Sequence, residues 1–317
     1  MKRFLILGGT RFAGKALVED LVSDGYDVTV LSRNPTGCPA GAKQIIEERE
    51  KGLKKIQGSS FEVCFDFIGY NAQAPIEVCE SINIKVYVLI STTWLPYYFS
   101  ITADKPVSGI ERFHGKHILN ETKNYLKGKA VAEQSVNKLR KRKIDATSVR
   151  IPIMLGRNDH TDRLNFYRAR LADGAGVILV NRGQNQVQVV WHRDVAKVLK
   201  EWILKSDPAE RSVWELLPLK SLSVREFITE LGYSNGYPLK FFSANYIKID
   251  KHVDGYLDLE PLWRERNQNV TKANLFYHAN LDPTPFSHWF KTLESVPEIS
   301  DKFLRRRECD FIRLLSS

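Results

Sequence analysis

Short apolar runs and helical patterns alternate through the first half of this 317-residue chain. The apolar runs are near-continuous, which is typical of strands that are covered by helices on both faces. We expect strands at residues 2–8, 27–33, 44–48, 62–69, 85–92 and 145–151, and helices at residues 13–25, 53–58, 75–82 and about 125–141. This alternation predicts an α/β fold with a doubly wound parallel sheet.

The second half of the chain is less regular. Residues 187–204 predict a strand followed by a helix, and the chain from about residue 206 carries many aromatic residues and several proline and glycine breaks. We therefore expect a dinucleotide-binding domain over residues 1–155, with a return segment at about 187–204. Residues 156–186 and 205–317 would form a smaller C-terminal substrate-binding lobe. Ligands of such folds bind at the carboxyl ends of the parallel strands.

A formal net charge of +10 favours anionic partners, such as nucleic acid, phosphates or nucleotide cofactors. The densest basic runs, at residues 138–143 and 305–307, are expected to be solvated helix ends. No apolar run approaches the roughly 20 residues of a membrane helix. The N-terminal apolar run is too short for a signal peptide, so we expect a cytoplasmic protein that does not enter a membrane.

The cysteine and histidine patterns predict neither a disulfide framework nor a metal site. The four cysteines are scattered, without a CxxC pair, and Cys64 lies in an apolar run that predicts a core position. His160 and His192 fall near the expected cleft, but none of the seven histidines has the spacing of metal ligands.

The turn LGGTRFAG, residues 7–14, allows two interpretations as a phosphate-binding loop. From Gly9 it nearly matches a nucleotidase P-loop, but Ala16 stands where Ser or Thr would hold Mg²⁺. Alternatively, Gly8, Arg11 and Gly14 form a G-x-x-G-x-x-G spacing with the middle glycine replaced. Backbone amides at the start of the next helix would then face a pyrophosphate, and Arg11 would add a positive charge beside it.

The second predicted strand indicates which dinucleotide would bind. A free ribose 2′-hydroxyl usually meets Asp or Glu at the end of that strand, but here the strand ends in Ser32 and Arg33. A guanidinium matches a phosphate dianion with two parallel hydrogen bonds. Arg11 and Arg33 together therefore predict NADP(H) as the cofactor.

Tyr125 and Lys129 have the i, i+4 spacing that places both on one face of a helix. A nearby ammonium is expected to lower the pKa of the tyrosine, which could then exchange a proton with a carbonyl or alcohol oxygen. Ser91, Thr92 and Thr93 follow the fifth predicted strand. We expect the hydroxyl of Thr93 to bind the substrate oxygen, which gives the predicted catalytic set Thr93, Tyr125 and Lys129.

Taken in order, these motifs resemble those of the extended and atypical short-chain dehydrogenase/reductases, which include sugar-nucleotide epimerases and reductases. GGTRFAG is similar to the GGTRFxG turn of an atypical branch, STTWLPY to the S-S-x-x-V-Y segment, and YLKGKAVAE, ending at Glu133, to Y-x-x-x-K-x-x-x-E. VRIPIMLG resembles the R-P-x-x-x-x-G segment beside the nicotinamide, with Arg150, Pro152 and Gly156. VVWHRDVA, with Asp194, resembles the returning segment, and residues 269–286 the closing helix and P-T-P-F turn.

The resemblance implies a Rossmann fold and hydride transfer between a nicotinamide and a sugar-like alcohol or ketone, with or without an attached nucleotide. Tyr125 would be the acid or base, Lys129 would hold the nicotinamide ribose, and Thr93 would bind the substrate oxygen. The expected cofactor contacts are Gly8, Thr10, Arg11, Phe12, Gly14, Ser32, Arg33, Glu48, Ile68, Gly69, Lys129 and Pro152. The expected substrate contacts are Thr93, Tyr97, Arg163 and Trp191.

Departures from the family pattern bear on the substrate. Trp94 and Leu95 follow Thr93 in place of the acidic residue of the dehydratases, which argues against elimination. Val187 stands where sugar-nucleotide epimerases carry an arginine for the diphosphate, a role open to Arg163, Arg168 or Arg182. The long segment between Thr93 and Tyr125 has the length of a functional lid, and its candidate pocket residues are Tyr97, Tyr98, Phe99 and His114.

Three alternatives to a reductase stay open. A 4-epimerase would use the same three catalytic residues without net turnover of NADPH. The GGTRF branch also resembles a stem-loop RNA-binding protein of chloroplasts, and RNA binding would suit the net charge. A regulator that binds NADP without turnover is the third. The resemblance further implies a homodimer formed through a four-helix bundle that includes the helix of Tyr125.

Overall fold

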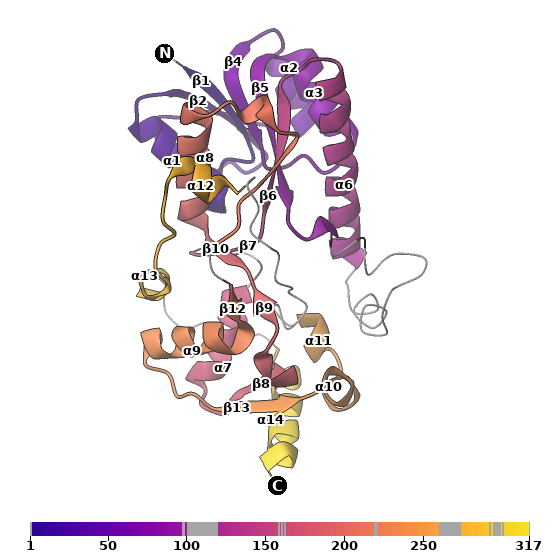
Figure 1. Cartoon of the computed structure of the whole chain (residues 1–317), viewed down its shortest axis with the longest axis vertical. Coiled ribbons are helices and arrows are strands. Elements are labelled where there is room, and N and C mark those ends of the chain that lie inside the picture. The colour runs from indigo at the N-terminus through magenta and orange to yellow at the C-terminus, as the bar shows by residue number, and fades with distance from the viewer. Residues whose placement is uncertain are drawn as a thin grey trace.

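The structure is a computed structural model. It describes residues 2–96, 99, 120–157, 159, 161, 163–218, 221–259, 274–291, 293, 299 and 301–316. Within these residues the molecule is elongated, with the N-terminus in the upper part and the C-terminus at the lower end (Figure 1).

A seven-stranded sheet forms the upper part, in the order β11-β6-β5-β4-β1-β2-β3. All six pairings between its neighbours are parallel, as predicted for a doubly wound sheet. The strands are β1 (Arg3–Leu7), β2 (Asp27–Ser32), β3 (Lys43–Ile46), β4 (Ser60–Asp66), β5 (Asn83–Thr92), β6 (Ala146–Ile151) and β11 (Val213–Glu215). The first six coincide with the apolar runs of the sequence, whereas the short strand β11 was not predicted.

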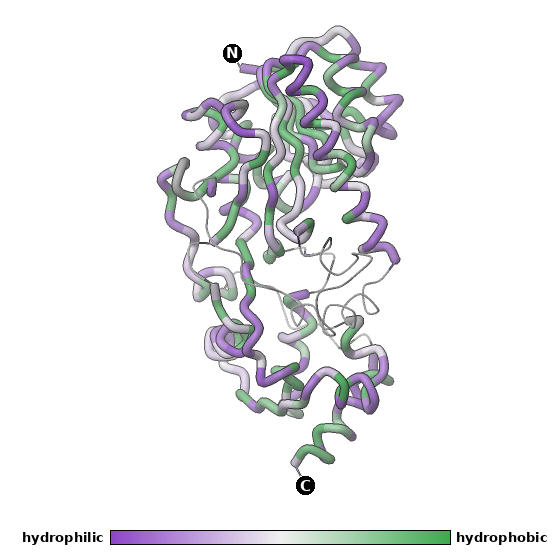
Figure 2. Tube along the Cα trace, turned by 45° about the vertical axis from the view of Figure 1, so that its right-hand side comes forward, coloured by the Kyte–Doolittle hydropathy of each residue, from purple (hydrophilic) through white to green (hydrophobic). Residues whose placement is uncertain are grey.

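Helices cover both faces of the sheet. One face carries α1 (Phe12–Ser23), α8 (His192–Lys205) and α12 (Leu275–Ala279). The other carries α2 (Arg49–Lys55), α3 (Gln73–Ser81) and α6 (Asn120–Lys141). Hydrophobic segments run through the strands between these two layers (Figure 2). This arrangement explains why the strands alternate so little between apolar and polar residues.

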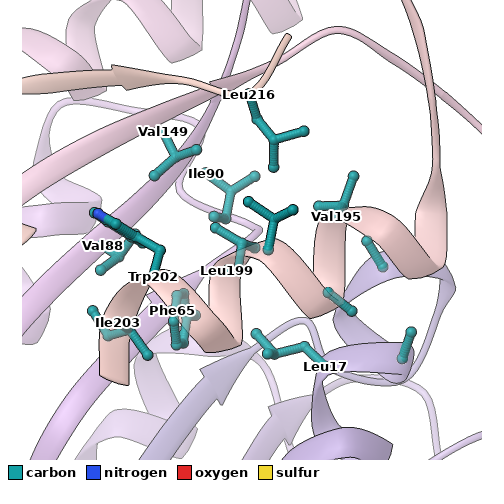
Figure 3. Close-up of a cluster of buried hydrophobic side chains, with 14 of the residues drawn as sticks. Leu17, Phe65, Val88, Ile90, Val149, Val195, Leu199, Trp202, Ile203 and Leu216 are labelled. Atoms are coloured by element: carbon teal, nitrogen blue, oxygen red, sulfur yellow. The ribbon is translucent and has the colours of Figure 1, made fainter. Parts of the chain in front are cut away.

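Helix α8 brings the second half of the chain back onto the sheet. Its side chains Val195, Leu199 and Trp202 are buried and face Val88 and other residues of the strands (Figure 3). Helix α12 packs in turn on α8 through Leu275, Phe276 and Ala279, which belong to the same core. Burial of this apolar area, at about 25 cal/mol per Å², is the main force that joins the two halves of the chain.

The lower part has two cores of its own, around β8 and on either side of it. Strand β7 (Ile153–Leu155) leads into it and pairs with β10 (Val189–Trp191), and β8 (Val177–Val180) pairs with β13 (Phe241–Ala244). The other elements are α7 (Arg163–Ala172), β9 (Gln186–Val187), β12 (Leu222–Ser223), α9 (Val224–Asn235), α10 (Tyr246–His252), α11 (Tyr256–Leu259), α13 (Phe286–Lys291) and α14 (Lys302–Ser316).

The expectation of a solvated basic run at residues 305–307 is wrong for Arg305, which is buried. Its guanidinium donates to both carboxylate oxygens of Asp173, each at 2.8 Å, and to Glu308 at 2.6 Å. Arg170 of α7 donates to Glu308 from the other side, at 2.6 and 2.9 Å. Two arginines therefore share the fully buried carboxylate of Glu308, and this network fixes α14 to α7.

We expect Glu308→Gln to lower the free energy of unfolding by about 3–5 kcal/mol, because it leaves two buried guanidinium groups without their shared carboxylate. Asp310 on the same helix pairs with Arg313 in solvent, so Asp310→Asn should change stability by less than about 1 kcal/mol. Urea unfolding of the two variants checks this. Equal losses would show that the buried network does not stabilise the helix.

Candidate active site at the carboxyl ends of the strands

The turn after β1 is closed so tightly that two of its positions accept only glycine. A Cβ at Gly14 would lie 2.6 Å from the carbonyl oxygen of Gly8, and one at Gly8 would lie 2.8 Å from Ile68 Cγ2. Gly8 also has a φ of +90°, which disfavours other residues. Helix α1 therefore begins directly against the turn, and its first amides lie at the carboxyl end of the sheet.

This turn fits the pyrophosphate of a dinucleotide. Arg11 is the N-cap of α1 and is exposed, and its side chain makes no capping hydrogen bond. An anion at the helix start would meet the first-turn amides and the helix dipole. Thr10 is buried beside the turn, where a Cβ at Gly37 would come within 2.7 Å of its carbonyl oxygen. Thr10, Arg11 and Gly14 thus lie together, as the cofactor prediction requires.

Phe12, an expected cofactor contact, packs against another side chain of the protein. Its ring stacks on His192, with centroids 5.1 Å apart and planes 5° from parallel. His192 in turn packs edge-on against Trp191. Burial lowers the pKa of His192 to about 4, so the ring that faces Phe12 is neutral.

A carboxylate from another segment of the chain lies near the end of β2, although the strand itself ends without one. Glu48, the N-cap of α2, lies 3.8 Å from the guanidinium of Arg33, and both side chains are largely exposed. Ser32 is buried, donates to the carbonyl of Asn34 at 3.1 Å and accepts from Gln44 at 3.1 Å. Arg33 and Glu48 are therefore free to face a ligand together, whereas the Ser32 hydroxyl is already bonded within the protein.

A buried ionic cluster lies under the loop that follows β4, and sequence reasoning missed it. Asp66 is fully buried and accepts hydrogen bonds from the two terminal nitrogens of Arg49, at 3.0 and 2.6 Å. It also accepts from the hydroxyl of Tyr87, at 2.7 Å, and from the amide of Ile68, at 3.0 Å. Arg49 reaches on to the carbonyl of Ala74, so the cluster fixes both ends of the loop.

The loop after β4 then passes close to the glycine turn that follows β1. Ile68 touches the position where a Cβ on Gly8 would lie. A Cβ on Gly69 would come within 2.8 Å of Leu89 Cδ1 and 3.0 Å of an Asp66 carboxylate oxygen. Ile68 and Gly69 are thus placed beside the glycine turn. Pro152 is buried between β6 and β7, away from this loop in the sequence.

Tyr125 and Lys129, the predicted pair on one helix face, project from α6 beside the same loop. Lys129 is almost completely buried, and its ammonium donates to the carbonyl of Ile90 at 2.7 Å and to that of Phe67 at 3.4 Å. The Tyr125 ring is 41% exposed and lies 5.9 Å from the same ammonium. Tyr70 contacts both, with its ring 4.3 Å from Lys129 Nζ and 5.7 Å from the ring of Tyr125.

The pKa of Tyr125 differs from the sequence expectation. Desolvation raises the pKa of this phenol, with a smaller contribution from Tyr70, and the guanidinium of Arg163 opposes the shift. Lys129 does not offset this rise, since burial lowers the pKa of its own ammonium to about 7 and the lysine is only partly charged at neutral pH. Asp66 favours the charged lysine and Arg49 disfavours it. Tyr125 therefore carries its proton at neutral pH in this structure.

Thr93 is buried directly after β5, and its amide donates to the carbonyl of Ile151 at 3.1 Å. The next two residues, Trp94 and Leu95, pack against Leu126 and Ala130 of α6. This contact brings the end of β5 next to the helical turn that carries Tyr125 and Lys129. Tyr97, Tyr98, His114 and His160 lie outside the described residues.

The predicted substrate contacts have different surroundings. Arg163 begins α7, donates to the hydroxyl of Thr161 at 2.8 Å and is near enough to Tyr125 to influence its pKa. Trp191 is buried in the lower core and stacks on Trp289, with centroids 5.4 Å apart, so little of its surface is left for a substrate. Val187 is buried as well, and the buried Arg168 donates to Asn165.

Two residues of the family motifs are structural in this chain. Glu133 accepts two hydrogen bonds from Arg150, at 3.0 and 2.7 Å, and so joins α6 to β6. Asp194, in the first turn of α8, accepts from the amide of Thr284 at 2.8 Å and from its hydroxyl, which fixes the P-T-P-F turn. The neighbouring Arg193 pairs with Glu19 and Asp20 of α1.

Within the described part of the chain, no group of three or more His, Cys, Asp or Glu side chains is placed to hold a metal ion. None of the described helices has both the length and the apolar character of a membrane span.

Comparison with known proteins places these features in context. No family model matches the sequence. Over 258 residues the chain is 23% identical to the sterol-4-alpha-carboxylate 3-dehydrogenase, decarboxylating, of Dictyostelium discoideum, which covers 73% of this chain and 75% of the relative.

Solved structures are similar over nearly the whole chain. A UDP-glucose 4-epimerase of Thermotoga maritima, solved with UDP-glucose, has a TM-score of 0.64 at 16% identity and covers 91% of this chain and 96% of its own. A UDP-glucuronic acid 4-epimerase of Bacillus cereus, solved with UDP-glucuronic acid and NAD, has a TM-score of 0.61 at 15% identity and covers 99% of both chains. The Rossmann fold expected from the sequence is thus confirmed, and this chain shares it with the two epimerase structures.

Proposed function

We propose that this chain is an oxidoreductase of the extended short-chain dehydrogenase/reductase type, with a nicotinamide dinucleotide as its cofactor. The observation that carries the proposal is the placement of Tyr125 and the buried Lys129 against the loop after β4, which itself touches the glycine turn of β1 at the carboxyl ends of parallel strands. Ligands of open α/β sheets bind at this edge. The similarity to a dehydrogenase and to epimerases supports the same class of reaction.

In the proposed reaction, the bound dinucleotide supplies or accepts the hydride. The raised pKa of Tyr125 keeps its phenol protonated, and a protonated phenol can donate to a carbonyl oxygen that is being reduced. Thr93 would bind that oxygen as charge develops on it. Lys129 lies where its ammonium can favour the phenolate that remains, and it would hold the nicotinamide ribose.

We propose NADP(H) as the preferred cofactor, because Arg33 is exposed at the end of β2 and Arg11 is exposed at the start of α1. Glu48, 3.8 Å from Arg33, acts in the opposite direction, since its carboxylate would repel a 2′-phosphate. One of the similar epimerases was solved with NAD. The balance between Arg33 and Glu48 therefore decides the preference.

Fluorescence titration with NADPH and NADH tests the cofactor. We expect tighter binding of NADPH, and a loss of about 10- to 100-fold in NADPH affinity in Arg33→Ala, since a hydrogen bond to a charged group contributes about 1.5–3 kcal/mol. Arg11→Ala should weaken the binding of NADPH more than that of NADH, because Arg11 is the second arginine proposed to favour the 2′-phosphate. Arg142→Ala, at the far end of α6, is the control. Binding of neither nucleotide would contradict the proposal and would favour the RNA-binding alternative, which a salt-dependent RNA titration then tests.

The catalytic assignment predicts that Tyr125→Phe lowers kcat by about 10²- to 10⁴-fold, which is the usual contribution of a general acid or base. Thr93→Val should lower kcat by about 10²- to 10³-fold, through the loss of a hydrogen bond to the reacting oxygen. Tyr233→Phe, an exposed tyrosine on α9, should leave the rate unchanged. A screen of ketones and alcohols with NADPH provides the substrate. Full activity of Tyr125→Phe would rule out the assigned acid.

The same assay separates a reductase from a 4-epimerase. A reductase consumes NADPH in proportion to product, whereas an epimerase returns the hydride and leaves the cofactor unchanged. Val187 is buried in the lower core and cannot replace the arginine that holds a nucleotide diphosphate. This favours a substrate without that diphosphate, although the solved epimerases carry UDP-sugars.

Arg163 is proposed to bind an anionic group of the substrate, because its guanidinium lies near Tyr125. The curated relative acts on a sterol carboxylate, which supplies such a group. We expect Arg163→Leu to raise KM by about 10- to 100-fold for carboxylate substrates and to leave neutral alcohols unaffected. Lys127→Leu, on the exposed side of α6, is the control. Equal effects on charged and neutral substrates would contradict this role.

The two-part organisation is likewise proposed: residues 1–155 and 187–204 bind the dinucleotide, and residues 156–186 and 205–317 bind the substrate. Two segments of the second range belong with the sheet instead, since β11 extends it and α12 packs on α8. Dimerisation through α6 remains a prediction from the family resemblance.

A further inference from the structure

Tyr70 is absent from the family motifs, yet it lies at the centre of the candidate site. It follows β4 by four residues and leaves 47% of its surface exposed. The face of its ring is 4.3 Å from Lys129 Nζ, closer than the ring of Tyr125 at 5.9 Å. The rings of Tyr70 and Tyr125 are themselves 5.7 Å apart. The ring of Tyr70 thus contacts both Lys129 and Tyr125.

The backbone of Tyr70 is held in place from two sides. On one side, a Cβ on Gly128 would lie 2.2 Å from the carbonyl oxygen of Tyr70, so α6 approaches the loop at the only residue of that turn without a side chain. On the other side, Gly69 is closed in by Leu89 and by Asp66, whose carboxylate is fixed by Arg49 and Tyr87. The position of the ring over the ammonium is therefore imposed by the fold.

We propose that Tyr70 is a positioning residue of this active site, whose ring binds the Lys129 ammonium and keeps it charged and directed toward Tyr125. The catalytic role of the ammonium rests on the function proposed above. The attraction between the Tyr70 ring and the ammonium does not depend on that function and can be measured on the protein alone. An aromatic face attracts a cation most strongly where water is excluded, and Lys129 is almost completely buried.

The charge of Lys129 is sensitive to its surroundings, because its pKa lies close to neutral pH. Burial brings its pKa to about 7; Asp66 and Glu133 favour the ammonium, and Arg49 opposes it. Tyr70 and Tyr125, the two phenols that face it, are neutral at that pH, because a phenol ordinarily has a pKa near 10 and desolvation raises the pKa of each further. The ammonium is present below its pKa and is lost above it. Any loss of attraction from the ring therefore moves the loss of charge to lower pH.

The test measures the pKa of Lys129 by NMR of the full-length protein labelled with ¹³C at lysine Cε, with the signal assigned through Lys129→Arg. Tyr70→Leu should lower this pKa by about 0.5 to 1, because it removes the cation–π attraction. Tyr70→Phe keeps the ring and should leave the pKa as in the wild type. Tyr70→Trp, which offers a larger aromatic face, should keep or raise it.

Equal pKa values in the wild type, Tyr70→Leu and Tyr70→Trp would overturn the proposal, as would an equal shift in Tyr70→Phe and Tyr70→Leu. Circular dichroism and the lysine spectrum itself show whether each variant folds. If Tyr70→Leu does not fold, Tyr70→Met, which also lacks the ring, takes its place, and a Lys129 pKa equal to that of the wild type in this variant overturns the proposal.

The activity readout is separate. With a substrate in hand, the alkaline limb of the kcat profile, which reports the loss of the Lys129 ammonium, should move down in pH in Tyr70→Leu by the same amount as the NMR value. In a Lys129→Arg background, the change at Tyr70 should leave the profile in place. Failure of dinucleotide binding would contradict the proposed function, whereas the NMR result would still decide the role of Tyr70.

Discussion

A parallel sheet with apolar residues on both faces has to be covered on both sides, and this constraint organises the whole molecule. Among the residues that the structure describes, the first half of the chain supplies α2, α3 and α6 for one face and α1 alone for the other. The second face is completed by α8 and α12, which come from the second half. The chain therefore has to return from the lower part to the sheet, and this return places the start of α8 beside the glycine turn.

The same constraint makes the candidate site a place where charge is hard to bury. Lys129 points from α6 into the layer between helix and sheet, so its ammonium is satisfied by backbone carbonyls and an aromatic ring instead of by water. Asp66 lies nearby with its own counter-ion, Arg49. Both charges are stabilised by contacts within the protein, and neither is screened by solvent. A site of this kind has protonation states that respond strongly to small changes around it.

Much of the fold could be predicted from the sequence, because apolar period and helix signals are local. The first six strands of the sheet and helices α1, α3, α6 and α8 follow directly from them. Strand β11 was missed because three residues carry too little periodicity. Arg305 was misjudged because the neighbouring basic residues suggested a solvated run. Its partners are Glu308 of the same helix and Asp173, which lies far away in the sequence, directly after α7.

The candidate site divides in the same way. Tyr125, Lys129 and the glycines of the turn were found because their spacing is local. The Arg33–Glu48 pair, the Asp66 cluster and Tyr70 depend on which strands become neighbours, and no local pattern encodes that. One signal was present: Asp66 has apolar residues on both sides in the run VCFDFI, residues 63–68, and a buried carboxylate requires a partner. The lowered pKa of Tyr125 was expected from Lys129 alone, without the burial that opposes it.

Three consecutive residues at the start of α8 link parts of the molecule that lie far apart in the sequence. The ring of His192 stacks on Phe12 at the glycine turn after β1. Arg193 is paired with α1, and Asp194 binds the turn at Thr284. The preceding residue, Trp191, belongs to the lower core. A shift of the lower core would therefore be transmitted through one helical turn to Phe12 and to the glycine turn after β1. The upper and lower parts of the molecule are mechanically coupled at this point.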